Sequence, residues 1–294
     1  MRTELSILIP TYNGDCRQQV SALLRQASAI EGLTFEIVVA DDHSPDRSLA
    51  SLCRETGRWP HCRFIGLEAN VGRAAIRNLL AREARYDWLL FMDCDMVVKE
   101  GMLGRYMATE GADVVDGGVA IGKGPAGNLR YLYEKSCEQH HTAAERRKRP
   151  YQHFHTANFM ISRPTMLATP FDERYRRYGY EDVVFGKQLA EKGIRIEHID
   201  NPAGFDRFET NEHFVAKTEE GLQTLFCFSS ELRGYSRMLT FVGGIHVPLV
   251  KTLLRTWHRL FGRLERRLLC SSHPSLAVFK AYKIGYYLSL TKTD

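Results

Sequence analysis

Two aspartates, Asp93 and Asp95, directly follow an unbroken apolar run from Trp88 to Met92. Such a run predicts a strand that is buried on both faces, as in a parallel sheet with helices above and below it. Ligands of open α/β sheets bind beyond the carboxyl ends of the strands. Paired carboxylates at that position suit Mg²⁺ or Mn²⁺, and these cations in turn suit a diphosphate. Because Asp-x-Asp occurs by chance about once in a chain of this size, a solvated turn is the alternative interpretation.

Acidic residues follow a second predicted strand, 35–40, in the same way. Asp41 and Asp42 come at its carboxyl end, and Ser44 or Asp46 is expected to cap the next helix. Capping does not account for Asp41 and Asp42, because both precede the cap. One of these two carboxylates could therefore accept the imide N–H of a pyrimidine base.

Two further side chains could contact a nucleotide. Tyr12 follows a first predicted strand, 5–10, and its ring could stack on a base, although a tyrosine in a surface turn is equally compatible with the pattern. Arg73 begins a predicted helix that is rich in small residues, and Arg77 lies four positions later on the same face. Arg73 could meet phosphate or solvent, whereas we expect Arg77 to be solvated.

Glu181 and Asp182 follow a segment rich in aromatic residues, 171–180, and begin an amphipathic helix. The macrodipole favours acids in the first turn of a helix, which is one reason for their presence there. An acid that is held between aromatic side chains could also take a proton from a substrate hydroxyl, as a general base does.

The elements that would position these side chains alternate between strand and helix over the first hundred residues. This order predicts an α/β protein with a mostly parallel, Rossmann-like sheet and helices on both faces. The chain contains no G-x-x-x-x-G-K-[ST] and no strand-bound G-x-G-x-x-G, which argues against Walker-type NTPases and dinucleotide dehydrogenases. Further along, 112–121 predicts a strand that bends at two glycines, and the basic run 146–149 predicts a solvated segment.

The composition is that of a soluble globular protein, with 44% hydrophobic residues and a formal net charge of +5. That charge suits an anionic ligand or membrane surface, and we expect no nucleic-acid partner. The seven cysteines include no C-x-x-C, so we expect free thiols in a reducing compartment and no zinc site. The N-terminus lacks a signal-peptide apolar segment, and the uncharged stretch from Met238 to Val250 has 13 residues, whereas a spanning helix needs about 20. We expect a cytoplasmic protein that could associate peripherally with the inner face of the cell membrane.

Five motifs stand in order between residue 5 and about residue 185. They are Ser6-Ile7-Leu8-Ile9-Pro10-Thr11-Tyr12-Asn13, Glu36-Ile37-Val38-Val39-Ala40-Asp41-Asp42-His43-Ser44, Gly72-Arg73-Ala74-Ala75-Ile76-Arg77-Asn78, Phe91-Met92-Asp93-Cys94-Asp95 and Tyr178-Gly179-Tyr180-Glu181-Asp182. Taken together and in this order, they make the chain resemble glycosyltransferase family 2, whose members have the GT-A fold.

The resemblance implies how a nucleotide-sugar donor would be bound. Tyr12 and Asp42 would bind the nucleotide base. Thr11 and Arg73 belong to the same expected donor-binding set, and Asp93 would help to hold the diphosphate.

The resemblance also implies a metal and a catalytic base. Asp93 and Asp95 would hold a divalent cation, Mn²⁺ or Mg²⁺, which neutralises the leaving nucleoside diphosphate. Asp182 would be the catalytic base of an inverting transfer, with Glu181 beside it contacting sugar hydroxyls. General-base help of this kind is typically worth about 10²–10⁴-fold in rate.

One position departs from the family pattern. Bacterial members often carry a histidine a few residues after an asparagine-proline pair, where it can complete the metal shell. Here Gly204-Phe205-Asp206 occupies that region. Asp206 or His198 could take the place of that histidine, or the nucleotide and water could fill the shell.

We expect a GT-A domain over 1–222, made of a nucleotide-binding half (1–100) and an acceptor and catalytic half (101–222), followed by a helical extension over 223–294. Within the extension, 251–268 carries six basic residues and one acid, with apolar residues at three- and four-residue spacing. This predicts a basic amphipathic helix with an aromatic edge.

The predicted helix could lie on an anionic membrane and bring the active site to a lipid-linked acceptor. Tyr282, Lys283, Tyr286 and Tyr287 would add an aromatic and basic end to such a surface. Alternatively, the apolar stripe of the helix could pack on the catalytic domain.

The sequence thus predicts a metal-dependent, inverting glycosyltransferase of the hexosyltransferase type in glycan, glycolipid or polysaccharide biosynthesis. Its donor would be a nucleotide sugar, most simply a UDP-sugar, and its acceptor a glycan or lipid-linked hydroxyl. One alternative is a nucleotidyltransferase, which normally has a glycine-rich basic loop after its first strand, unlike Thr11-Tyr12-Asn13-Gly14-Asp15. Another is a non-catalytic GT-A-like module that binds nucleotide or membrane, and the presence of both Asp93/Asp95 and Asp182 argues against it.

Overall fold

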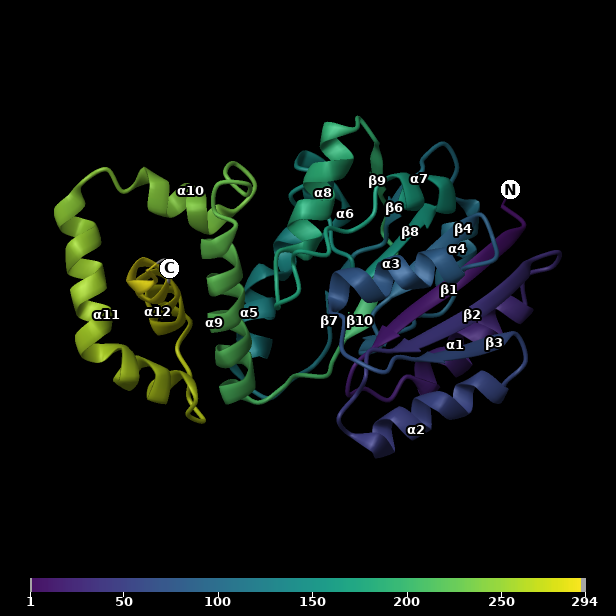
Figure 1. The fold of residues 1–294 in the computed structure, drawn as a ribbon, viewed down its shortest axis with the longest axis horizontal. Coiled ribbons are helices and arrows are strands. Elements are labelled where there is room, and N and C mark those ends of the chain that lie inside the picture. Colours follow the sequence, from purple (N-terminus) through teal and green to yellow (C-terminus); the bar gives the residue numbers. More distant parts are fainter. Residues whose placement is uncertain (1, 292–294) are drawn as a thin grey trace.

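A seven-stranded sheet is the centre of the computed structural model, which describes residues 2–291 (Figure 1). The strands lie in the order β3-β2-β1-β4-β8-β6-β9. Neighbours are parallel, except that β8 runs antiparallel to both β4 and β6. The strands are β1 (Glu4–Thr11), β2 (Thr34–Asp41), β3 (Cys62–Gly66), β4 (Trp88–Met92), β6 (Val114–Asp116), β8 (Asn158–Ser162) and β9 (Ile196–His198). The predicted α/β class and mostly parallel sheet are confirmed.

The interior residues of the first strands are buried because helices cover both faces of the sheet. Successive side chains of a strand point to opposite faces, so Ile7 belongs to one core and Leu8 to the other. The first core is closed by α1 (Arg17–Ser28), α2 (Arg47–Glu55) and α4 (Met102–Ala108). The second core is closed by α3 (Arg73–Glu83), α7 (Arg163–Ala168) and α8 (Glu181–Glu191).

A small three-stranded sheet follows the carboxyl end of β4. Its order is β5-β10-β7, with β10 antiparallel to β5 and parallel to β7. The strands are β5 (Met96–Val97), β7 (Val119–Ile121) and β10 (Ala203–Phe205). The strand predicted over 112–121 is therefore two strands, β6 and β7, which belong to different sheets. Gly117 and Gly118 separate the two strands. Gly118 has a φ of 81°, in the left-handed region, which lets the chain change direction there.

The chain ends in helices that pack beside the sheet. Figure 1 shows α9 (Asn211–Cys227) next to the sheet region, α11 (Pro248–Leu269) farthest from it, and α12 (Leu276–Ser289) between the two. Residue 222, the predicted end of the GT-A domain, lies inside α9. The remaining helices are η1 (Thr56–Arg58), α5 (Leu129–Cys137), η2 (Glu138–His140), α6 (Ala143–Lys148) and α10 (Arg237–Gly244). None of the helices within residues 2–291 is long and apolar enough to cross a bilayer.

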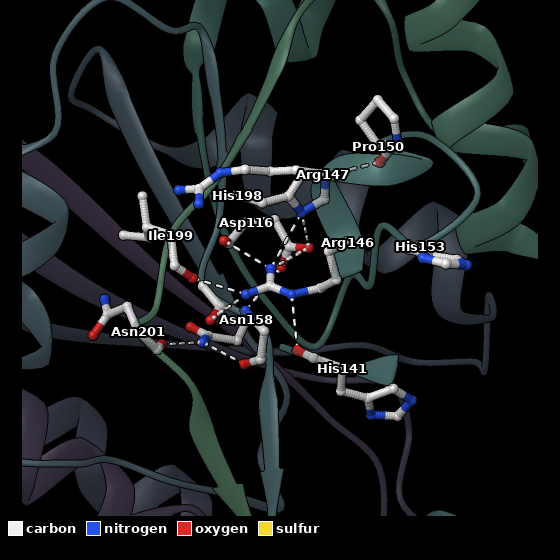
Figure 2. A network of polar contacts seen from close by, with 12 residues as sticks. Asp116, His141, Arg146, Arg147, Pro150, His153, Asn158, His198, Ile199 and Asn201 are labelled. Carbon is white, nitrogen blue, oxygen red and sulfur yellow. Dashed lines mark hydrogen bonds and ion pairs between the residues drawn. The ribbon is translucent and has the colours of Figure 1, made fainter. Parts of the chain in front are cut away.

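Arg146 corrects the prediction that the whole basic run 146–149 is solvated. Helix α6 turns this side chain inward, where it is 1% exposed and lies 2.8 Å from a carboxylate oxygen of Asp116 (Figure 2). Its guanidinium also donates to the carbonyls of Gly117 and Ile199. The carboxylate of Asp116 also accepts from Nδ1 of His198. Arg146 thus ties α6 to the carboxyl ends of β6 and β9.

Electrostatics favour the charged form of Asp116 in this network. Complete burial alone would raise the pKa of Asp116, but the hydrogen bond from His198 and the charge of Arg146 bring it below its ordinary value. Arg147, the next residue along, is half exposed and makes a long pair with Glu197 at 3.4 Å. Neighbours in the basic run therefore differ in role because α6 points them in different directions.

Candidate active site

The carboxyl ends of β2, β1 and β4 meet at one edge of the sheet and bring three predicted residues together. Tyr12 comes directly after β1, Asp42 directly after β2, and Asp93 directly after β4. Because the three strands are neighbours and parallel, these residues lie side by side. The amide N–H of Asp42 donates to the carbonyl of Thr11 at 2.9 Å, which ties the first two loops together.

The two aspartates after β2 have different surroundings. The side chain of Asp41 accepts from the amide and the hydroxyl of Ser44, whose hydroxyl in turn accepts from the amide of Asn13 at 2.8 Å. Asp41 therefore holds the loop in shape. Asp42 accepts from the amides of Val71 at 2.7 Å and Gly72 at 3.0 Å, just before α3.

Asp42 is buried, and this burial raises its pKa, although the two amide hydrogen bonds work in the opposite direction. Its hydrogen bonds require a close approach of the chain at Gly72. Gly72 has a φ of 90°, and a Cβ there would lie 3.1 Å from the carbonyl oxygen of Arg176. The sequence therefore uses glycine where the loop meets both Asp42 and the segment before Tyr178.

The two residues at the end of β1 differ in exposure. The ring of Tyr12 is 51% exposed and free to stack on a planar ligand. Thr11 is buried, and its hydroxyl lies 3.3 Å from the carbonyl of Gly14, to which it donates. This geometry lets Thr11 shape the turn that carries Tyr12, and a direct contact of its side chain with a donor stays a prediction.

Asp93 is paired with Arg77, which is predicted from the sequence to be solvated. Nη2 of Arg77 lies 2.5 Å from Oδ1 of Asp93, and Arg77 is 2% exposed. The expectation for Arg77 is therefore wrong, because α3 places it against the sheet edge, with its guanidinium also 5.7 Å from the ring of Phe171. The backbone of Asp93 is fixed as well, since its carbonyl accepts from Nε2 of Gln19 at 2.7 Å.

Asp95 differs from Asp93 in having no partner for its side chain among residues 2–291. Partial burial and the negative charge of Asp93 raise the pKa of Asp95, and the charges of Arg73 and Lys217 oppose this. A half-buried carboxylate beside a second carboxylate is a suitable ligand for a hard cation. Within the described part of the chain, however, no group of three or more histidine, cysteine, aspartate or glutamate side chains could hold a metal.

Asp93 and Asp95 therefore suit a cation that takes most of its ligands from groups other than protein side chains. Mg²⁺ typically binds one or two carboxylates and completes its octahedron with phosphate oxygens and water. His198 and Asp206, the two residues predicted as possible third ligands, do not add a protein ligand to this pair. His198 is completely buried, and its ring nitrogens bond to Asp116 at 2.9 Å and to the carbonyl of Pro150 at 2.9 Å (Figure 2). Asp206 is exposed after β10.

Glu181 and Asp182 begin α8, as predicted. The chain enters this helix through Gly179 and Tyr180, which both have positive φ, of 93° and 71°. The left-handed backbone conformation favours glycine at position 179. Partial burial and the charge of Glu181 raise the pKa of Asp182 to about 6. Asp182 is thus ionised at neutral pH and still basic enough to accept a proton.

Glu181 has one carboxylate oxygen in use and one without a partner. Its Oε1 lies 3.5 Å from Nη1 of Arg73, whereas Oε2 is buried and has no hydrogen-bond partner within residues 2–291. A buried acceptor without a donor is costly unless a ligand supplies one. The free oxygen of Glu181 is therefore available to a hydroxyl group.

Two cationic side chains lie close to the ring of Tyr178. The guanidinium of Arg73 is 5.0 Å and the ammonium of Lys217 4.9 Å from the centre of that ring. Lys217 comes from α9 and pairs with Glu209 at 3.1 Å. No role is predicted for Lys217 from the sequence, because only the packing of α9 onto the loop at Tyr178 brings its ammonium near the acids.

Comparison with known proteins gives a family for this arrangement. The model of the family described as "Glycosyl transferase family 2" matches residues 6–168. Chondroitin synthase of Pasteurella multocida is 26% identical over 232 residues, which cover 67% of this chain and 24% of that protein. Succinoglycan biosynthesis protein ExoO of Rhizobium meliloti is 30% identical over 118 residues, covering 40% of this chain and 32% of that protein. The chain thus spans about a third or less of the length of these relatives.

Two solved structures share the fold at low identity. TarS residues 1–349 of S. aureus, in complex with UDP-GlcNAc, superposes with a TM-score of 0.53 at 16% identity, covering 97% of this chain and 89% of that one. The mannosyltransferase PcManGT of Pyrobaculum calidifontis, in complex with GDP-Man and Mn²⁺, superposes with a TM-score of 0.54 at 14% identity, covering 97% and 84%. The predicted GT-A fold is confirmed by these similarities.

Proposed function

This chain belongs to glycosyltransferase family 2, and we propose that it is an inverting enzyme that moves a sugar from a UDP-sugar to a hydroxyl of a glycan or of a lipid-linked sugar. The observation that carries the proposal is the place of Arg73. Its guanidinium pairs with Glu181 and lies close enough to Asp93 and Asp95 to interact with their charges. The acids after β4 and the acids at the start of α8 therefore lie close enough to the same arginine to interact with its charge.

The donor would lie along the edge formed by β2, β1 and β4. The exposed ring of Tyr12 is the stacking surface for the base, and Asp42 is the acceptor for the imide N–H of a uracil. The diphosphate would lie toward Arg73 and Lys217, whose positive charges suit it. UDP-GlcNAc and GDP-Man are bound by the two similar structures, so a nucleotide sugar of this kind is the donor class that we propose.

Asp95, with Asp93, would hold Mn²⁺ or Mg²⁺, since its carboxylate has no protein partner in the described residues and one or two carboxylates suffice for such a cation. When bound, the cation supplies charge neutralisation to the leaving nucleoside diphosphate. Asp93 contributes less charge to this site, because Arg77 already neutralises it.

In the transfer itself, Asp182 would take the proton of the acceptor hydroxyl as that oxygen bonds to the anomeric carbon. The bond from the anomeric carbon to the diphosphate oxygen breaks on the opposite face, so the configuration inverts. A pKa of about 6 matches this role near neutral pH. The unpartnered oxygen of Glu181 would accept from a sugar hydroxyl and fix the sugar ring.

The proposal is tested by incubating the full chain with a panel of nucleotide sugars, with and without Mn²⁺, and measuring release of nucleoside diphosphate. We expect release from a UDP-sugar, stimulation by the cation, and loss of that stimulation in Asp95→Asn. Asp200→Asn, an exposed aspartate outside the site, is the matched control and should behave like the unmodified chain.

Other outcomes separate the alternatives. Binding of UDP without any release would support a non-catalytic module. Release of pyrophosphate from UTP and a sugar phosphate would support a nucleotidyltransferase, an alternative that membership of this family does not favour.

A further inference from the structure

Helix α11 turns a continuous apolar stripe away from the protein. The stripe, here called the outer face, consists of side chains that are between 39% and 71% exposed: Leu249, Val250, Leu253, Trp257, Leu260, Phe261, Leu264 and Leu268. Their spacing of three and four residues places them on one side of the helix. Phe241 of α10 and Val247, just before α11, are each 55% exposed and extend the apolar surface at one end.

The opposite side of α11 makes the contacts with the rest of the protein. His258 packs against the ring of Tyr282 at 5.1 Å, and a Cβ at Gly285 would lie 2.7 Å from the Cβ of His258. Nε of Arg266 lies 2.9 Å from a carboxylate oxygen of Glu219 on α9. Within α11 itself, Glu265 is buried and accepts from Nε1 of Trp257 at 2.8 Å. The alternative in which the apolar stripe packs on the catalytic domain is therefore wrong, because the side chains of the stripe are exposed and α11 packs through its opposite side, with His258 and the buried Leu269.

The aromatic and basic end of the chain is also turned inward, contrary to the expectation that it meets a membrane. Tyr282 and Tyr287 are buried. The ammonium of Lys283 lies 4.6 Å from the ring of Tyr133 and 4.7 Å from that of Phe279. Of these two helices, α11 is therefore the one that presents its apolar and aromatic side chains to a partner.

Basic residues flank the outer face along one side. Arg259, Arg263 and Arg267 are exposed, four residues apart, and make no hydrogen bond or ion pair within residues 2–291. The one acid of α11, Glu265, lies on the inward side. Anything that covers the outer face therefore meets apolar side chains bordered by positive charge, with no negative charge between them.

We propose that the outer face of α11 is a docking surface for an anionic lipid bilayer, with the helix lying in the plane of the membrane interface. An amphipathic helix of this kind buries its apolar side at the boundary between head groups and acyl chains, while its arginines meet anionic head groups. With 22 residues at about 1.5 Å per residue, the helix lies along roughly 33 Å of surface. A second copy of the chain would bring the same arginines together, so like charges oppose self-association at this face.

The inference goes beyond the transfer reaction, because binding to a bilayer is measured without donor or acceptor. Flotation of the full chain with vesicles of phosphatidylcholine, with and without phosphatidylglycerol, tests it. We expect flotation only when phosphatidylglycerol is present. The variant Leu253→Ser/Trp257→Ser/Leu260→Ser should bind at least about tenfold more weakly, because each removed side chain contributes apolar area at the interface. Leu167→Ser, at a 43% exposed leucine of α7, should bind normally.

The charge requirement is tested separately. Arg259→Gln/Arg263→Gln/Arg267→Gln should weaken binding to the anionic vesicles by about a hundredfold at low salt, since each basic residue near such a surface contributes on the order of tenfold or less. The control Arg47→Gln/Arg54→Gln/Arg58→Gln removes the same charge from exposed arginines at α2 and η1. Equal losses in both triple variants would show a non-specific effect of net charge and would overturn the proposal.

Two further outcomes would also overturn it. One is the absence of flotation with phosphatidylglycerol vesicles. The other is a dimer, seen by analytical ultracentrifugation without vesicles, that the Leu253/Trp257/Leu260 variant dissociates, because the outer face would then be an interface between two copies. Circular dichroism of each variant separates loss of the surface from loss of the fold.

Discussion

Nη2 of Arg77 lies 2.5 Å from Oδ1 of Asp93, and this contact makes the two aspartates of Asp93-Cys94-Asp95 unequal. Arg77 is buried on α3, so the charge of Asp93 is neutralised from inside the protein. Asp95, two residues later, has no such partner among the described residues, and its pKa is raised by partial burial and by Asp93. The pair thus combines an acid that is held in place with one that is available to a ligand.

The ion pair between Arg77 and Asp93 predicts that replacing Arg77 lowers the stability of the protein substantially. Arg77→Met should destabilise the protein by about 3–5 kcal/mol, because it leaves a partly buried carboxylate without its cation. Asp93→Asn should restore part of that loss in the double variant, as expected for coupled partners. Urea unfolding followed by tryptophan fluorescence measures both. Arg82→Met, at an exposed arginine of the same helix, should change stability by less than about 0.5 kcal/mol.

The raised pKa of Asp182 predicts a pH dependence for transfer. The group must be deprotonated to act as a base, so kcat/KM should fall below about pH 6 and level off above it. The variant Asp182→Asn should transfer the sugar about 10²–10⁴-fold more slowly, and its rate should no longer fall as the pH drops through about 6. Its binding of UDP, measured by calorimetry, should stay unchanged. A variant that transfers at the normal rate would show that another group is the base. Asp200→Asn should keep both the rate and the pH profile of the unmodified chain.

The position of Lys217 predicts that α9 contributes to binding of the nucleotide-sugar donor. Its ammonium lies near Tyr178, and its charge acts on Asp95. Lys217→Gln should weaken UDP binding by about tenfold, which is what the loss of one charge-assisted hydrogen bond typically costs. Lys217→Arg should keep most of the affinity, and Lys280→Gln, an exposed lysine of α12, should keep all of it. If uridine binding fell as much as UDP binding, Lys217 would be acting on the shape of the site and not on the diphosphate.

The sequence predicts well those features that depend on neighbouring residues. The apolar runs at β1, β2 and β4 mark buried strands, and parallel pairing then places Tyr12, Asp42 and Asp93 at one edge. Arg77 and Arg146 were expected in solvent because their partners, Asp93 and Asp116, lie 16 and 30 residues away. A local pattern of charges cannot show which member of a basic run meets a distant acid.

Helix α11 illustrates a second limit of the same kind. The spacing of its leucines predicts an apolar stripe, and the structure confirms that stripe. Which side of the helix packs inward depends instead on Gly262, Gly285 and His258, whose close contact is visible only in three dimensions. Amphipathicity therefore predicts the existence of two faces but not which of them is covered.

The network around Arg146 gives the last prediction, because it pairs a buried arginine with an exposed neighbour. Arg146→Met should destabilise the protein by about 3–5 kcal/mol, since it leaves Asp116 buried beside His198 without its main cation. Arg147→Met, one residue later and half exposed, should change stability by less than about 0.5 kcal/mol. Asp116 has a lowered pKa in the folded state, so its contribution is present above its unfolded pKa of about 3.9 and is lost as the pH falls through the lower folded value. Acid unfolding should therefore show a shallower loss of stability below about pH 4 in Asp116→Asn than in the unmodified protein. Equal stabilities of the Arg146 and Arg147 variants in urea would contradict the role given to this network.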